Sequence, residues 1–229
     1  MGAANHYPAL ACFMHITHSA HSLLLLPFIS RQHIHLATSW KPTLYAVQPS
    51  RYHPREANWQ DYHHYTATQL SSAVRPWLLD RGSLTRRLIK ASGNQFKVQV
   101  LQQNWQRPRM SEACLLGMPQ RELAIVREVV LLCAGEPWVF ARSVIPAGSV
   151  TGRLRRLRKF NDSSLGEMLF KDPSMRRKTF QIARIDGDSQ QIPASLHQTH
   201  QLWGRRCRFE LANQPIMVSE VFLTSFSPH

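Results

Sequence analysis

Two side chains of opposite charge occupy apolar positions in segments that alternate like β-strands. Arg127 shares one face of its segment with four aliphatic residues, Leu123, Ile125, Val129 and Leu131. Glu220 shares a face with three apolar residues near the C-terminus, Ile216, Val218 and Phe222. An unpaired charge in an apolar environment costs several kcal/mol, so each residue needs an ionic partner, water or a ligand.

The pattern leaves two interpretations of Arg127 and Glu220 open. In the first, they pair with each other or with other charged residues, Glu128, Arg206 and Arg208 among them. In the second, they line an internal pocket and contact opposite ends of a polar ligand. Arg127 would then offer two parallel donors to a carboxylate, and Glu220 would accept a hydrogen bond from a hydroxyl.

Strands paired through short turns are expected to position these two residues. Residues 123–133 and 137–145 are rich in β-branched residues, and Ala134-Gly135-Glu136 between them predicts a hairpin. A second hairpin is predicted near the C-terminus, where residues 209–211 and 216–223 flank Asn213-Gln214-Pro215. Two further strands are predicted at residues 96–103 and 179–185.

Helices are predicted mainly in the front and middle of the chain. Residues 69–79 indicate a helix interrupted near Pro76, and Ser83 can cap a helix over residues 84–90. Ser164 and Glu167 form a capping box that begins a short helix over residues 165–170. This order predicts an α+β fold, in which an antiparallel sheet carries helices on one face.

The composition divides the chain into two unequal parts. No acidic residue precedes Glu56, and nine of the twelve histidines fall within the first 64 positions. We therefore predict a poorly patterned, His-rich extension over residues 1–58 and one folded domain over residues 59–229. His15, His18 and His21 recur at helical spacing, but without a nearby Cys or carboxylate they do not indicate a functional metal site.

The net charge and the cysteine pattern bear on the binding partners and the cellular compartment of the protein. The formal charge of +14 would attract nucleic acid, an anionic membrane or a small anionic substrate, and charge alone does not choose among them. The four cysteines are scattered without a C-x-x-C pair, which favours reduced thiols in a cytoplasmic protein. The longest aliphatic run, residues 23–26, is far too short to span a bilayer.

Five ordered stretches carry a resemblance to a known family. They are REVVLLCAGEPW at 127–138, ARSVIP at 141–146, SLGEMLF at 164–170, LWGRRCRF at 202–209 and QPIMVSEVFL at 214–223. Together they resemble the chorismate pyruvate-lyase family over about residues 70–229, and the polar stretch at 186–200 is longer than that family leads us to expect. The first 55 or so residues have no part in the resemblance.

The resemblance implies a sheet of about six strands and an internal active site under helical flaps. The carboxylate-binding arginine of the family falls on Arg127, its hydroxyl-binding glutamate on Glu220 and its flap leucine on Leu165. A substrate-contacting methionine of the family is replaced by Leu84, where a backbone contact would survive the change. Arg206, together with Arg205 and Arg208, is either surface charge or a contact for the dianionic substrate.

The implied activity is the cleavage of chorismate into 4-hydroxybenzoate and pyruvate, with no metal or organic cofactor and with retention of the aromatic product. That product would feed ubiquinone synthesis through a membrane prenyltransferase. We expect a monomer that neither binds nucleic acid nor spans a membrane. The alternative is a non-catalytic sensor domain of the same fold, which would bind a small aromatic acid without turning it over.

Overall fold

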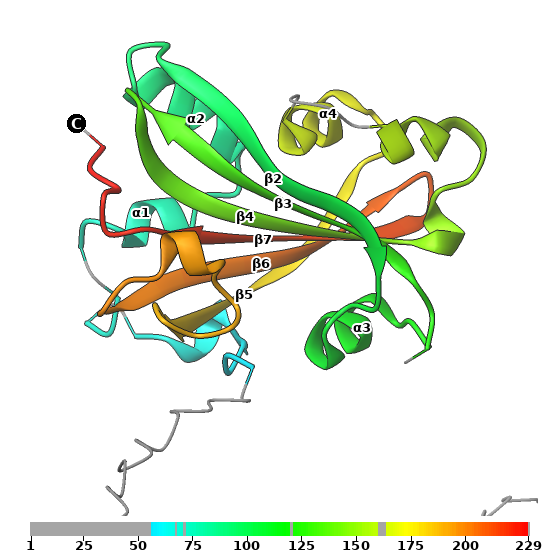
Figure 1. The fold of residues 1–229 in the computed structure, drawn as a ribbon, viewed down its shortest axis with the longest axis horizontal. Coiled ribbons are helices and arrows are strands. Elements are labelled where there is room, and N and C mark those ends of the chain that lie inside the picture. The colour runs from blue at the N-terminus through cyan, green and yellow to red at the C-terminus, as the bar shows by residue number, and fades with distance from the viewer. Residues whose placement is uncertain (1–55, 67, 71, 120, 160–163, 229) are drawn as a thin grey trace, which may run out of the picture. The chain divides into compact units, whose positions relative to one another are not determined.

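The protein is described by a computed structural model that covers residues 56–66, 68–70, 72–119, 121–159 and 164–228. A seven-stranded antiparallel sheet, in the order β1-β5-β6-β7-β4-β3-β2, forms its centre (Figure 1). The strands are β1 (Gln60–Asp61), β2 (Phe96–Gln106), β3 (Ala124–Cys133), β4 (Glu136–Pro146), β5 (Arg176–Asp186), β6 (Gln201–Leu211) and β7 (Gln214–Phe222). The expected α+β class with an antiparallel sheet is confirmed.

Both predicted hairpins are present. The first joins β3 to β4 through Ala134 and Gly135, which both have positive φ angles, as such tight turns require. The second joins β6 to β7 through Ala212 and Asn213. The pairing of β4 with β7 brings the two hairpins together, so the segments that carry Arg127 and Glu220 lie in one continuous sheet.

Helices cover both faces of the sheet. They are α1 (Arg75–Leu78), α2 (Leu84–Ala91), α3 (Met110–Leu116) and α4 (Leu165–Lys171), with 3-10 turns at Tyr62–His64, Ala147–Ser149, Gly152–Lys159 and Ala194–Leu196. Ser83 accepts a hydrogen bond from the Arg86 amide and Ser164 accepts one from the Glu167 amide, so both predicted caps are formed. The helix predicted at residues 69–79 is only the single turn α1, with Pro76 in its first turn.

We call the face covered by α1, α2 and α4 the front face and the face covered by α3 the back face. On the front, Leu84, Leu88, Leu165 and Leu169 belong to the main core with the β3 and β4 side chains. On the back, Leu116 of α3 packs in a smaller cluster formed by Ala124, Val126, Val144 and Met217. In Figure 1, α3 lies on the opposite side of the sheet from α2 and α4, which the sequence did not lead us to expect.

The expectations for the first 58 residues and for His15, His18 and His21 lie largely outside the described residues. Within the described residues, no group of three His, Cys, Asp or Glu side chains is placed to hold a metal ion. No helix in the described part of the chain has the length and apolarity needed to cross a membrane.

Candidate active site

The strand register places Arg127 and Glu220 on the same face of the sheet. Arg127 on β3 lies opposite Ser143 on β4, and Ser143 lies opposite Val218 on β7. Glu220 is two residues beyond Val218 and lies opposite Ala141. Because neighbouring strands are about 4.8 Å apart, the two backbones are separated by about 10 Å across the sheet, with a two-residue offset along it. A ring with a polar group at each end is of the size to bridge such a span.

Arg127 points into the front core. Its exposed fraction is 2%, which confirms the buried position predicted from the strand alternation. Glu220 is less buried, with 19% of its side chain exposed. The two residues therefore place a guanidinium and a carboxylate under the front helices, which is an uncommon environment for charged side chains unless they serve a partner.

Arg205 holds the carboxylate of Glu220. Its Nε donates to Oε2 of Glu220 at 2.6 Å, and the two residues lie opposite each other on β6 and β7. Its Nη1 donates to the carbonyl oxygens of Trp77 at 2.7 Å and Asp80 at 2.8 Å. Arg205 is 2% exposed, so the guanidinium of this ion pair is shielded from water, and its hydrogen bond fixes the orientation of the carboxylate. Among the described residues, no hydrogen bond reaches Oε1 of Glu220.

The two expected flap residues begin neighbouring helices. Leu84 is the first residue of α2 and Leu165 the first of α4, and both are buried in the front core. The hydroxyl groups of Thr85 and Ser164 are 2.6 Å apart and join the two helix starts by a hydrogen bond. Leu84 and Leu165 thus lie on helices that are tied together above the face that carries Arg127 and Glu220.

Arg206 lies on the back face and is not brought together with Arg127 and Glu220. Its Nη1 donates to the Ser111 hydroxyl at 2.8 Å, its Nε donates to Gln181, and its guanidinium lies over the Trp59 ring. Burial lowers the pKa of Arg206 to about 10. The interpretation of Arg205 and Arg206 as exposed surface charge is wrong, because they are 2% and 6% exposed.

The sequence named Arg205 only as one of three arginines that are either surface charge or a substrate contact, and it gave no indication of the pairing with Glu220. The strand was predicted to begin at Phe209, whereas β6 begins at Gln201. With the longer strand, Trp203, Arg205, Cys207 and Phe209 alternate onto the front face, and the signal is the same one that revealed Arg127 and Glu220. A run of three arginines around Cys207 hid the alternation, since it resembles a solvated charged segment.

Comparison with known proteins decides the family. A family model described as "Chorismate lyase" matches residues 53–227, which is most of the chain. The chain belongs to the chorismate lyase family. Two relatives named "Probable chorismate pyruvate-lyase" are each 40% identical to it. The protein of Pseudomonas fluorescens aligns over 154 residues, covering 67% of this chain and 81% of its own length. The protein of Psychromonas ingrahamii aligns over 165 residues, covering 69% and 86%.

Among solved structures, the effector domain of PhnF from Mycobacterium smegmatis matches with a TM-score of 0.47 and 17% sequence identity. The match covers 64% of this chain and 91% of that domain. The stretches that suggested the chorismate lyase family from sequence lie on β3, β4, α4, β6 and β7, the elements that carry Arg127, Leu165, Arg205 and Glu220.

This arrangement can bind an anion at one end and a hydroxyl at the other. The guanidinium of Arg127 suits a carboxylate, because its donors are planar and parallel. The Glu220 carboxylate, oriented through Oε2 by Arg205, can accept a hydrogen bond at Oε1. The apolar residues between them, Val129 and Ala141 among them, suit the faces of a ring.

Proposed function

We propose that this chain is a chorismate pyruvate-lyase, which converts chorismate to 4-hydroxybenzoate and pyruvate in the cytoplasm. The observation that carries the proposal is the placement of Arg127 and Glu220 on one face of the sheet, with strand β4 between them, in a member of the chorismate lyase family. In this proposal Arg127 binds the ring carboxylate and Glu220 accepts a hydrogen bond from the 4-hydroxyl. Leu84 and Leu165 close over the ring, and the product serves ubiquinone synthesis.

The reaction needs little chemical equipment, because its product is aromatic. Hydrogen leaves the ring carbon that bears the hydroxyl and passes to the CH2 carbon of the enolpyruvyl group, which becomes the methyl group of pyruvate. The ring C–O bond breaks in the same step, and its electrons form the pyruvate carbonyl. The enzyme's main contribution is to hold the side chain folded over the ring, so neither a metal nor an organic cofactor has a role in the proposed step.

Arg205 acts in this proposal as a positioning residue. By holding Oε2 of Glu220, it fixes the orientation of the carboxylate and aims Oε1 at the hydroxyl of the substrate. The structure places Arg206 on the opposite face, so we assign the front-face role to Arg205 and leave Arg206 out of the substrate contacts.

The proposal is tested by mixing the purified chain with chorismate in the presence of a chelator. 4-Hydroxybenzoate is followed by absorbance and pyruvate by a coupled assay. We expect equal amounts of the two products and a loss of at least about a hundredfold in kcat/KM for Arg127→Ala, since a charge-assisted bidentate contact is removed. Arg176→Ala, which removes the same charge from the exposed start of β5, serves as the matched control. Tight 4-hydroxybenzoate binding without turnover would instead identify a non-catalytic sensor.

Two roles of Glu220 can be separated with Glu220→Gln, which keeps one oxygen acceptor but cannot take a proton. If Glu220 only positions the hydroxyl, kcat should fall by less than about tenfold, whereas loss of a general base costs about 100- to 10,000-fold. We expect the smaller loss, because the proposed hydrogen transfer runs within the substrate. A loss in the larger range, with the variant still folded, would assign proton abstraction to Glu220.

A further inference from the structure

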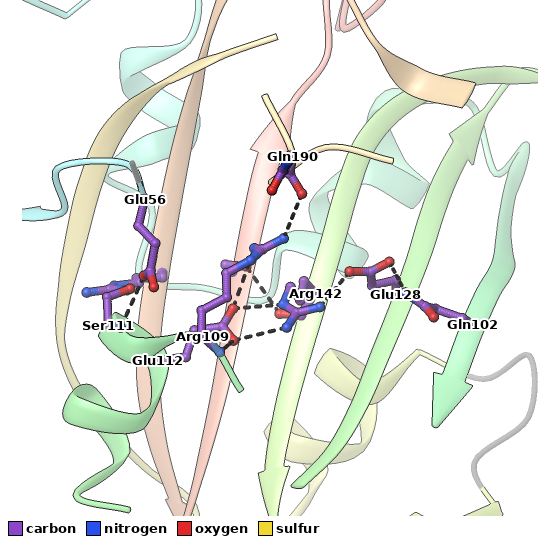
Figure 2. A network of polar contacts seen from close by, with 10 residues as sticks. Glu56, Gln102, Arg109, Ser111, Glu112, Glu128, Arg142 and Gln190 are labelled. Carbon is purple, nitrogen blue, oxygen red and sulfur yellow. Dashed lines mark hydrogen bonds and ion pairs between the residues drawn. The ribbon is translucent and has the colours of Figure 1, made fainter. Parts of the chain in front are cut away.

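A second groove lies on the back face, away from the candidate active site. It has a volume of about 550 Å³ and is lined by four segments of the chain. Gln102 to Arg109 come from β2 and the connection to α3, Glu128 and Arg142 come from β3 and β4, and residues 190–197 come from the connection between β5 and β6. Figure 2 shows Gln190 of this connection next to Arg109.

The connection between β5 and β6 forms one wall of this groove. It is the polar stretch that exceeds the length expected from the chorismate lyase resemblance, and it contributes half of the residues that line the groove. It is locally ordered, because the ring of His197 contacts the carbonyl oxygen of Ile192 at 3.0 Å. The Gly187 backbone also accepts a hydrogen bond from the Gln198 amide.

The groove contains more positive than negative groups. Arg142 is fully engaged: it donates to Glu112 at 2.7 and 3.1 Å and to Glu128 at 2.6 Å (Figure 2). Arg109 makes longer contacts, at 3.6 Å to Glu112 and 3.3 Å to the Gln190 carbonyl oxygen. Among the described residues, no carboxylate lies within ion-pair distance of Arg107, which is exposed. Of these three guanidinium groups, only those of Arg109 and Arg142 have carboxylate partners among the described residues.

Two side chains that line the groove, Gln106 and Arg109, lie in unfavourable surroundings. The Nε2 atom of Gln106 is buried and has no hydrogen-bond partner. Burial, followed by the positive charge of Arg142, lowers the pKa of Arg109. Two neighbouring guanidinium groups repel each other, and an anion bound in the groove would relieve this repulsion.

We propose that this groove binds a small organic anion through a carboxylate or phosphate group held by Arg107 and Arg109. Ile192 and Pro193 line the groove and offer apolar surface to the rest of the ligand. The volume lies within the range of about 300 to 1,000 Å³ that is usual for small-molecule sites. The active site binds its own anion on the other face, so the two ligands should not compete.

The test uses the full chain and calorimetric titration with three probes. The charged groups of citrate are all carboxylates, the charged group of glucose 6-phosphate is a phosphate, and glucose is the uncharged control. We expect one of the two anions to bind saturably with a Kd below about 1 mM, and glucose not to bind. The anion that binds identifies the preferred group. Binding should be unchanged by saturating 4-hydroxybenzoate, which would fill the front site.

Variants locate the binding. Arg107→Gln removes an exposed charge, and it should weaken binding by about tenfold or more through loss of a charge-assisted contact. Arg109→Gln should do the same, with its folding checked by thermal melting because Arg109 also contacts Glu112. Arg176→Gln, exposed at the start of β5, is the control and should bind as the parent does. The proposal fails if neither anion binds up to about 10 mM. It also fails if 4-hydroxybenzoate displaces the anion or if all three variants bind equally.

Discussion

Replacement of Arg142 by methionine tests how the buried charges behind the sheet are stabilised. Arg142 lies between two carboxylates, and the side chains of Arg142, Glu112 and Glu128 are exposed by only 5%, 5% and 8%. The replacement keeps an unbranched side chain but leaves Glu128 buried without a cation and Glu112 with only the longer contact to Arg109. We therefore expect Arg142→Met to be strongly destabilising, although methionine itself is well suited to a buried position.

The magnitude follows from the contacts that are lost. Arg142 donates three hydrogen bonds to carboxylate oxygens. Each is worth about 1.5 to 3 kcal/mol, but bonds from one group are not additive. Breaking a buried pair typically costs about 3 to 5 kcal/mol, and we expect a loss in the free energy of unfolding of that size at pH 7.

The pH dependence of the stability gives a sharper check, because Arg142 supplies the largest contributions that lower the pKa of Glu112. Burial alone raises the pKa of Glu112, but the hydrogen bonds and charge of Arg142 outweigh it and hold the pKa below the ordinary value of 4.5. In the parent, this contribution to stability is present above pH 4.5 and is lost as the pH falls through the lower folded value. Without Arg142, only the charge and the backbone amide of Arg109 oppose the effect of burial, so the pKa of Glu112 should be higher than in the parent. Acidification toward pH 4.5 should therefore stabilise the variant relative to the parent.

Urea unfolding at several pH values between 7 and 4 measures this difference directly. The gap in unfolding free energy between parent and Arg142→Met should shrink as the pH falls. A variant that also carries Glu112→Gln and Glu128→Gln should recover much of the stability at pH 7, since neither carboxylate is then buried without Arg142 and the Arg109 side chain is 25% exposed to water. A gap below about 1 kcal/mol at pH 7, or one that widens on acidification, would refute the argument.

Three further predictions concern single positions. Ser164→Ala should lower the free energy of unfolding by about 1 kcal/mol in a urea titration, because α4 loses its N-cap. Gly187→Ala should destabilise the protein in the same assay, since its Cβ would lie 2.5 Å from the Gln198 carbonyl oxygen, and a result equal to the parent would show that the connection can move aside. Iodoacetamide at pH 8 should modify the exposed Cys114 and leave Cys133 unmodified by peptide mass mapping, because burial raises the pKa of Cys133 to about 11.

Much of the front face could be predicted from local rules. The alternation around Arg127 and Glu220 depends only on the two-residue period of a strand, and it placed both charges on the correct face. The caps Ser83 and Ser164 are equally local, because each side chain satisfies an amide three residues away. The order of the strands in the sheet, by contrast, is not contained in any single segment.

The back face was not predicted, and the reason is physical. The cluster around Arg142 joins residues from α3, β3 and β4, and its stability depends on contacts between segments far apart in sequence. In the sequence, Arg142 and Glu128 look like ordinary outward-facing charges on a two-faced strand. Only the packing of α3 onto that face, which Leu116 secures, shows that they are buried.

Each strand of the sheet directs successive side chains to opposite faces, and this limits where residues can be inserted or deleted in evolution. Arg127 and Glu128 are neighbours in sequence, yet one faces the front core and the other the back-face cluster. Gain or loss of one residue within β3 would send each side chain to the opposite face. Lineages can therefore add or delete residues only where the chain leaves the sheet, as in the connection between β5 and β6.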